Sequence, residues 1–372
     1  MQPAPTDKPH FILGFRGSLD GIRGSAMCLV LVVHATYLLV PRYSGLYVPG
    51  GFIAVDSFFV LSGFLITSLL VEERAKYGRV SFRKFYLRRA LRLFPALWVV
   101  IIAQLIYTVV FGDPLKGDVE GLAYILFYVT NWATTFNGPV PFGMGQMWSL
   151  AVEEQFYLLW PALLVILLRR SRSMFVSVAM ILIAVALVSR VVLWHSGLGW
   201  EQIYVQTETR FDDLIMGALL AYGLSVGWRS PRWVSWLVGP SVAFLLWVIV
   251  AVHRADGWLY DGGYTVVAAA LTAVIWAAVQ PRHWVARVLS WRPFQVIGVC
   301  SYSLYLWHVL IFEGLYRSAA GRPPAELLVM GFGLTFVAGF GSRYLVERPF
   351  LRMKNRFGRR PPSAKLLAEG SA

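Results

Sequence analysis

The sequence has 372 residues and a formal net charge of +14, although only 15% of its residues are charged and 57% are hydrophobic. Together with a mean hydropathy of +0.60, this composition excludes an ordinary soluble domain and indicates a polytopic membrane protein. The lysines and arginines gather between apolar stretches and near the C-terminus. That distribution is typical of residues that set membrane orientation, and it argues against nucleic acid as the partner.

Apolar stretches recur along the chain from Ser25 to Leu345, each long enough for a hydrocarbon core of about 30 Å. The basic segment 74–92 is predicted to be cytoplasmic, and the other spans alternate from it. Segment 121–136 is apolar but short and precedes several Gly and Pro residues, so we expect it to re-enter the membrane or lie in its interface. The sequence predicts an all-α, polytopic transmembrane helix bundle of about ten helices with both termini cytoplasmic. The spans are expected at about 25–41, 52–71, a third that ends near Phe111, 146–168, 174–195, 209–227, 233–252, 264–281, 296–316 and 325–345.

The predicted bundle forms one domain with a short segment on either side. Residues 1–24 are expected to be a cytoplasmic N-terminal segment, 25–350 a single transmembrane domain, and 351–372 a basic, disordered cytoplasmic tail. No small-residue cleavage pattern follows the first apolar run, so we expect that run to be retained as a helix.

Several classes of site have no support in the sequence. It contains no HExxH, Walker or Rossmann pattern, so zinc catalysis and nucleotide hydrolysis are not indicated. Cys28 and Cys300 belong to apolar helices and lack the spacing of metal ligands. We therefore predict no metal site and no bound cofactor.

His34 lies near the centre of the first predicted span, where an ionisable side chain costs about 3 kcal/mol on insertion scales. Such a residue seldom lies in a membrane without a partner or a task, so His34 is a candidate functional residue. Arg23, eleven residues earlier, shares its helix face but lies roughly 16 Å away along the axis. The pair would line one channel suited to a long ligand with an anionic head. The alternative is that Arg23 only sets orientation and His34 only joins two helices.

A polar stripe is predicted on the helix at 146–168. Gln146, Ser149, Glu153 and Tyr157 recur at spacings of three and four, which places them on one face. Glu154 points about 100° away from Glu153, so we expect it to be solvated. The alternative for Glu153 is a carboxylate that stays hydrated near the outer interface.

Asp56 and Glu153 are the predicted partners of His34. If the helices converge, either carboxylate would hold one nitrogen of His34 and fix its tautomer. Ser301, Tyr305 and His308 also share one helix face, which makes His308 a second candidate, with a purely structural role as the alternative.

The sequence resembles the acyltransferase 3 family over nearly its whole length. The first two matching blocks are Leu19-Asp20-Gly21-Ile22-Arg23-Gly24, with ten residues between Arg23 and His34, and the stretch from Gly51 to Ile66 that includes Asp56. The remaining blocks are Arg88-Arg89-Ala90-Leu91-Arg92-Leu93-Phe94-Pro95, Trp148 to Tyr157, Arg210-Phe211-Asp212-Asp213-Leu214, Ser301 to His308, and Glu347-Arg348-Pro349. An ordered set of this kind is highly specific.

The resemblance implies a bacterial plasma-membrane enzyme that moves an acyl group, commonly acetyl, from acyl-CoA as co-substrate to a hydroxyl. Acceptors in the family are mostly carbohydrates, including cell-surface glycans and lipopolysaccharide, and also macrolides. Some members carry an SGNH hydrolase-like domain after the bundle. Only a short basic tail follows Pro349 here, so we expect any extra-cytoplasmic transfer to need a separate partner protein.

Under this interpretation His34 is the general base, and Asp56 or Glu153 stabilises the imidazolium that forms. A transient acyl-histidine is an alternative. Paired guanidinium hydrogen bonds would hold the CoA phosphates, with Arg23, Arg88, Arg89 and Arg92 as candidates, although these residues also set topology. The further site candidates are Ser149, Tyr157, Arg210, Tyr305 and His308.

The rival hypothesis from another class is a proton-coupled secondary transporter or exporter in which His34, Asp56 and Glu153 form a proton relay. No inverted pair of Gly- or Pro-broken helices supports it. A catalytically silent, glycan- or lipid-binding relative is a weaker rival, because Arg23 and His34 are both present.

Overall fold

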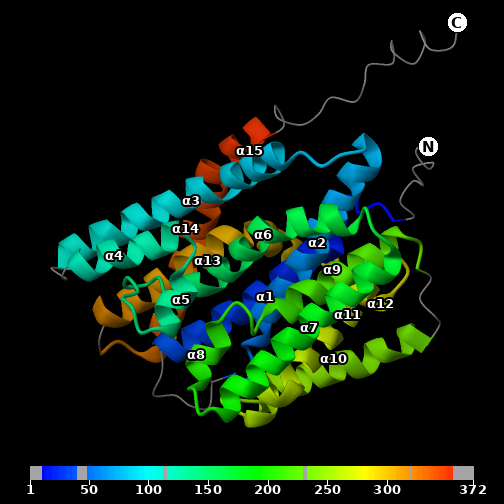
Figure 1. The fold of residues 1–372 in the computed structure, drawn as a ribbon. Coiled ribbons are helices and arrows are strands. Elements are labelled where there is room, and N and C mark those ends of the chain that lie inside the picture. The colour runs from blue at the N-terminus through cyan, green and yellow to red at the C-terminus, as the bar shows by residue number, and fades with distance from the viewer. Residues whose placement is uncertain (1–10, 40–47, 112–114, 229–232, 319–320, 355–372) are drawn as a thin grey trace, which may run out of the picture.

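The computed structural model describes residues 11–39, 48–111, 115–228, 233–318 and 321–354. These residues form helices and connecting turns, and none of them forms a strand (Figure 1). The expected tail 351–372 lies largely outside the described residues. The elements are α1 (Gly17–His34), η1 (Ala35–Leu39), α2 (Ile53–Tyr77), α3 (Phe82–Phe111), α4 (Leu115–Leu126), α5 (Thr130–Thr135), α6 (Met147–Leu167), α7 (Arg172–His195), α8 (Trp200–Val205), α9 (Phe211–Ser225), α10 (Trp233–Ala251), η3 (Leu259–Gly263), α11 (Tyr264–Ala278), α12 (Trp284–Leu289), α13 (Arg292–Ser318), α14 (Pro324–Gly341), η4 (Ser342–Glu347) and α15 (Arg348–Lys354).

The predicted helical membrane bundle is confirmed. Within the described part of the chain, nine helices are long and apolar enough to cross a bilayer. A tenth span, expected at 209–227, corresponds to α9, whose 15 residues make a helix only about 22 Å long. Segment 121–136 is divided between α4 and α5, which have 12 and 6 residues and are too short to span.

The first helix begins earlier than its hydropathy suggests. α1 starts at Gly17, eight residues before the expected start at residue 25, so part of the expected cytoplasmic segment 1–24 is helical. Leu19 and Ile22 are buried, and Asp20 lies in the first turn, where a carboxylate interacts favourably with the helix dipole. Packing of this amphipathic turn therefore extends the helix past the apolar run.

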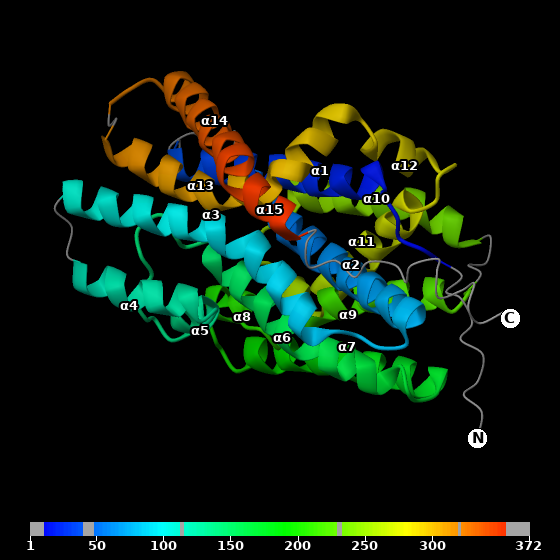
Figure 2. The ribbon, with the colours of Figure 1, turned by 90° about the horizontal axis from the view of Figure 1, so that it is seen from above.

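Glycines allow the central helices to approach closely. α1 packs along α13, and α2 packs along α9 (Figure 2). A Cβ added to Gly24 would collide with the carbonyl oxygen of Phe294, and one added to Gly63 would collide with that of Leu214. Small residues at helix contacts are typical of membrane bundles, where close backbone packing supplies much of the association energy. The glycines of the two N-terminal motifs thus bring α1 and α2 against the second half of the chain.

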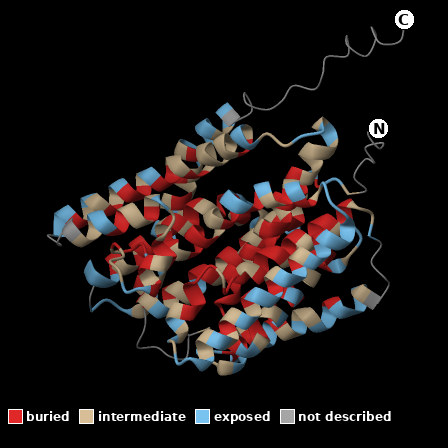
Figure 3. Ribbon diagram, in the orientation of Figure 1, coloured by how far each residue is buried: buried red, intermediate tan, exposed pale blue. Residues whose placement is uncertain are grey.

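α7 and α10 lie at the periphery of the bundle, and only about 22% of the apolar window in each is buried. Their outward faces carry exposed apolar side chains such as Ile181, Val188, Leu246 and Val250 (Figure 3). In a bilayer those faces contact lipid, whereas α2, with 72% of its window buried, lies in the protein interior. Asp56 on α2 and Asp212 and Asp213 on α9 are buried in this interior.

Candidate active site

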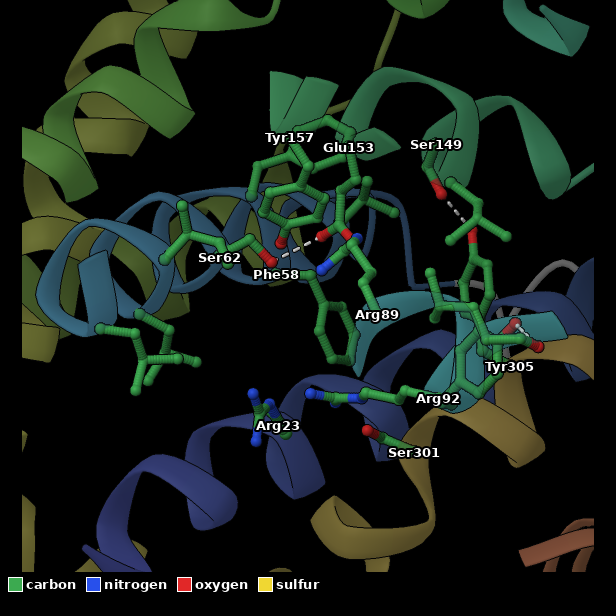
Figure 4. Close-up of a pocket in the computed structure, with 18 residues that line it drawn as sticks. Arg23, Phe58, Ser62, Arg89, Arg92, Ser149, Glu153, Tyr157, Ser301 and Tyr305 are labelled. Carbon is green, nitrogen blue, oxygen red and sulfur yellow. Dashed lines mark hydrogen bonds between the residues drawn. The ribbon is translucent and has the colours of Figure 1, made fainter. Parts of the chain in front are cut away.

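The first cavity lies between α1, α2, α3, α6 and α13 and has a volume of about 180 Å³ (Figure 4). We call it the Arg92 cavity; its polar lining includes Arg23, Ser62, Arg89, Arg92, Ser149, Glu153, Tyr157, Ser301 and Tyr305. Ser149, Glu153 and Tyr157 all reach it from α6, as their helical spacing predicts. Ser62 on α2 donates a hydrogen bond of 2.7 Å to Glu153.

The three arginines of this cavity differ in their partners. Arg89 forms a forked pair with Glu154, with Nε at 2.8 and 2.7 Å from the two carboxylate oxygens, and its guanidinium stacks 3.3 Å above the ring of Tyr157. Arg23 pairs with Asp20 at 3.1 Å. Arg92 has no acidic partner among the described residues, so it is the arginine best placed to receive an anionic ligand.

One expectation about this region is wrong. Glu154 is not solvated, because its side chain is only 11% exposed and pairs with Arg89. Arg88, predicted to bind the same ligand as Arg92, does not line this cavity and pairs with Glu73 at 3.2 Å, so its role in ligand binding stays a prediction. Its position on α3 turns it toward the end of α2, away from the bundle interior.

A second cavity, of about 200 Å³, surrounds His34 and opens toward the other end of α1. We call it the His34 cavity; its lining includes Tyr37, Phe52, Gln146, Trp148, Tyr204, Arg254, Tyr305 and Glu313. Aromatic rings form much of its wall, with Trp148 and Tyr204 at a centroid distance of 4.9 Å. Burial raises the pKa of the Tyr204 phenol above its ordinary value, so this hydroxyl is a neutral donor at physiological pH.

His308, which is fully buried on α13, lies against His34. Its Nε2 is 3.3 Å from His34 Nδ1, and its Nδ1 is 2.7 Å from the carbonyl oxygen of Tyr305. A carbonyl oxygen can only accept, so His308 carries its proton on Nδ1 and its Nε2 accepts from His34. His34 Nδ1 also lies 3.1 Å from the carbonyl oxygen of Val30, which requires the same tautomer. The lone pair of His34 Nε2 is therefore free, with no protein partner among the described residues.

The expected contact of His34 with Asp56 or Glu153 is wrong. Glu153 bonds Ser62 in the other cavity, and Asp56 forms a fully buried ion pair with Arg210. Helix two is rotated so that Asp56 faces α9, which packs closely on α2. Asp56 and Arg210 line neither cavity.

Arg210 instead belongs to a buried charge network that packs behind Tyr204, a residue in the wall of the His34 cavity. It also pairs with Asp213 at 3.2 Å and lies 4.9 Å from the ring of Tyr204. Next to it, Arg190 donates to both oxygens of Asp212 at 2.8 and 2.5 Å. Buried charges on α2, α7 and α9 are thus neutralised by one another.

The two cavities meet at Tyr305 and Val55, which line both. The Tyr305 hydroxyl donates to the Gln146 carbonyl at 3.0 Å and lies 2.6 Å from the Ser149 hydroxyl (Figure 4). Arg23 and His34 were expected to line one channel; they open into two adjacent cavities, with Tyr305 as the partition. A ligand that extends from Arg92 to His34 would pass the shared wall at Tyr305 and Val55.

Several polar cavity residues were not predicted as site residues from the sequence, among them Ser62, Tyr204, Arg254 and Glu313. Ser62 lies in the matching stretch from Gly51 to Ile66, whereas Tyr204 carries no signal beyond its residue type. Arg254 had one, because it is an arginine in a loop expected on the side opposite the basic loops, against the usual distribution of positive charge.

Comparison with known proteins identifies the architecture. The family model described as an acyltransferase domain matches residues 16–343, which include every helix that lines the two cavities. No solved structure matches the chain.

Several curated relatives are named as O-acetyltransferases. O-acetyltransferase OatA of Staphylococcus aureus is 31% identical, over 92% of this chain and 57% of the relative. Peptidoglycan O-acetyltransferase OatA of Listeria monocytogenes is 32% identical, over 78% and 48%, and putative peptidoglycan O-acetyltransferase YrhL of Bacillus subtilis is 31% identical, over 89% and 54%. The chain thus spans about half the length of these relatives. Because the family model covers most of the chain, including both cavities, the chain belongs to the acyltransferase 3 family of membrane acyltransferases.

Proposed function

We propose that this protein is a bacterial plasma-membrane O-acetyltransferase that transfers acetyl from acetyl-CoA to a carbohydrate hydroxyl, with His34 as the general base. The observation that carries the proposal is the ordered pair His34–His308, which leaves Nε2 of His34 unprotonated beside a cavity. Membership of the family and the printed activity of the relatives support an acetyl group and a glycan acceptor.

In the proposed reaction an acceptor hydroxyl occupies the His34 cavity. His34 Nε2 removes its proton as the oxygen attacks the thioester carbonyl carbon, and a new ester C–O bond forms. The C–S bond then breaks, and the thiolate leaves with the proton that the imidazolium returns. A positioned base of this kind contributes about 10²–10⁴ in rate. His308 supports the step because its Nε2 accepts from His34 Nδ1, which carries part of the developing positive charge.

The donor would occupy the Arg92 cavity. Arg92 and Arg23 offer guanidinium donors for the phosphates, which they bind through paired hydrogen bonds. From Arg23 to His34 the rise along α1 is roughly 16 Å, so an elongated donor with its phosphates at one end can present its thioester near Tyr305. Glu153 and Ser149 would then lie beside the donor arm, where both line the cavity.

The first test is CoA release from acetyl-CoA by purified full-length protein in detergent, supplied with a panel of glycan oligomers and a macrolide. Wild type is expected to release CoA only when a suitable acceptor is present. His34→Ala is expected to lose about 10²–10⁴ of that rate. His195→Ala is the matched control, because His195 is 64% exposed, pairs with Asp261 and lines neither cavity.

Equal release by wild type and His34→Ala would remove His34 from the mechanism. No release with any acceptor would favour the transporter hypothesis, which is then tested by uptake into sealed vesicles. Equal yields of monodisperse protein for all variants establish that His34→Ala still inserts and folds.

A further inference from the structure

The His34 cavity contains a guanidinium that the proposed reaction does not use. Arg254 lies in the turn between α10 and η3 and lines the cavity together with His34. Its guanidinium lies 5.2 Å from the ring of Trp200 and 5.8 Å from that of Tyr204. Its carbonyl oxygen accepts a 2.8 Å hydrogen bond from Tyr260, which is fully buried. The turn is therefore anchored to the bundle, and the side chain is supported on two aromatic faces.

Arg254, like Arg92, has no acidic partner among the described residues. Arg89, Arg190 and Arg210 each pair with a carboxylate, whereas no described carboxylate pairs with Arg254. Glu313 lines the same cavity but receives the backbone N–H of Gly143 at 2.9 Å and forms no ion pair with Arg254. A partly buried cation without a counter-ion is costly unless a ligand supplies one.

We infer that Arg254 binds an anionic group, a carboxylate or a phosphate, that the acceptor carries close to the hydroxyl that reacts at His34. This inference rests on the proposed function and specifies its substrate class: an acidic saccharide. The guanidinium fork matches the two oxygens of either anion, and Trp148 and Tyr204 provide flat apolar surfaces for a sugar ring. The Arg254 guanidinium would hold the acidic group of the sugar ring and so position that ring beside His34. Arg254 therefore determines specificity without taking part in proton transfer.

The decisive test compares two acceptors that differ only in charge. The probes are N-acetylhexosamine oligomers in which one sugar ring carries a carboxyl group, and the same oligomers with that carboxyl group converted to an amide. Wild type is expected to show a KM at least about tenfold lower for the charged oligomer, and Arg254→Gln is expected to lose that difference while the KM for the amide stays the same. Arg254→Lys should retain part of the preference, because it keeps the charge but not the fork. A phosphorylated oligomer and its dephosphorylated form make the second pair and distinguish phosphate from carboxylate.

A binding measurement separates this inference from the proposed function. Dissociation constants of the four oligomers are measured for His34→Ala and for His34→Ala/Arg254→Gln, neither of which needs to turn over. Loss of affinity for a charged oligomer alone in the double variant supports the inference even if no acetyl transfer is found. Equal affinity of the two variants for both charged oligomers overturns it. A fall in CoA affinity on Arg254→Gln also overturns it, since the cation would then serve the donor.

Discussion

Nε2 of His308 lies 3.3 Å from Nδ1 of His34, and this contact, together with that of Nδ1 to the Val30 carbonyl oxygen, determines which nitrogen of His34 is free to accept a proton. The orienting group is a second imidazole whose own tautomer is fixed by the Tyr305 carbonyl oxygen. A chain of hydrogen bonds thus runs from the backbone of α13 to the candidate base on α1. An apolar region accommodates this neutral chain more cheaply than a carboxylate, whose burial costs several kcal/mol.

His308 should therefore act as a positioning residue. His308→Ala removes one of the two acceptors of Nδ1–H and leaves the Val30 carbonyl oxygen. We expect kcat to fall about 10- to 100-fold with little change in the KM for acetyl-CoA, because the base loses part of its orientation but not the donor site. His308→Gln should recover part of the rate, since its amide oxygen can accept from Nδ1. Steady-state kinetics on both variants measure this. Equal loss in both, together with equally lowered thermal stability, would mean that His308 only fills space.

Arg92 should contribute to donor binding more than the arginines around it. Arg92→Gln is expected to raise the KM for acetyl-CoA at least about tenfold, because a charge-assisted hydrogen bond contributes about 1.5–3 kcal/mol. Arg83→Gln is the matched control, since Arg83 is exposed in the same basic segment and lines neither cavity. A similar KM for both variants would show that this region sets topology alone.

Tyr305 should limit access between the two cavities. Tyr305→Phe removes the hydroxyl that is bonded to Ser149 and Gln146, at a net cost of about 1 kcal/mol for each hydrogen bond. We expect CoA release in the absence of acceptor to rise, because water from the His34 cavity reaches the thioester more easily. The measured quantity is uncoupled CoA release relative to coupled release. Unchanged uncoupled release in Tyr305→Phe and Tyr305→Ala would contradict the role of Tyr305 as a partition.

The ion pair of Arg210 with Asp56 should be structural. Arg210→Met leaves Asp56 and Asp213 buried without a cation, so we expect a loss of about 3–5 kcal/mol in stability. Arg322→Met is the control, because its pair with Glu326 is about half exposed and contributes no more than about 1 kcal/mol. Thermal unfolding in detergent compares the two variants. If Asp56→Asn kept its thermal stability but lost acetyl transfer, Asp56 would be catalytic, as the sequence first indicated.

The sequence by itself predicted the membrane helix bundle and the α6 residues that line the Arg92 cavity. Apolar length fixes where a chain can cross a bilayer, and the spacing of Ser149, Glu153 and Tyr157 fixes a common helix face. Both are properties of one segment, and both agree with the structure. The motif glycines were visible too, although only packing shows that Gly24 and Gly63 mark helix contacts.

The tertiary structure alone decided which polar groups meet. Periodicity cannot say how far one helix is rotated against the next, and that rotation turns Asp56 toward Arg210 and brings His308, 274 residues away in sequence, to His34. The packing of α3 on α6 also buries Glu154 against Arg89, although the helical spacing of α6 alone predicted that Glu154 would be exposed to solvent. Arg254 lines the His34 cavity from a loop whose backbone is held by a hydrogen bond from Tyr260. No periodic pattern in the sequence predicts that hydrogen bond. Pairing between helices depends on crossing geometry and close backbone packing, which the order of residues along one helix does not specify.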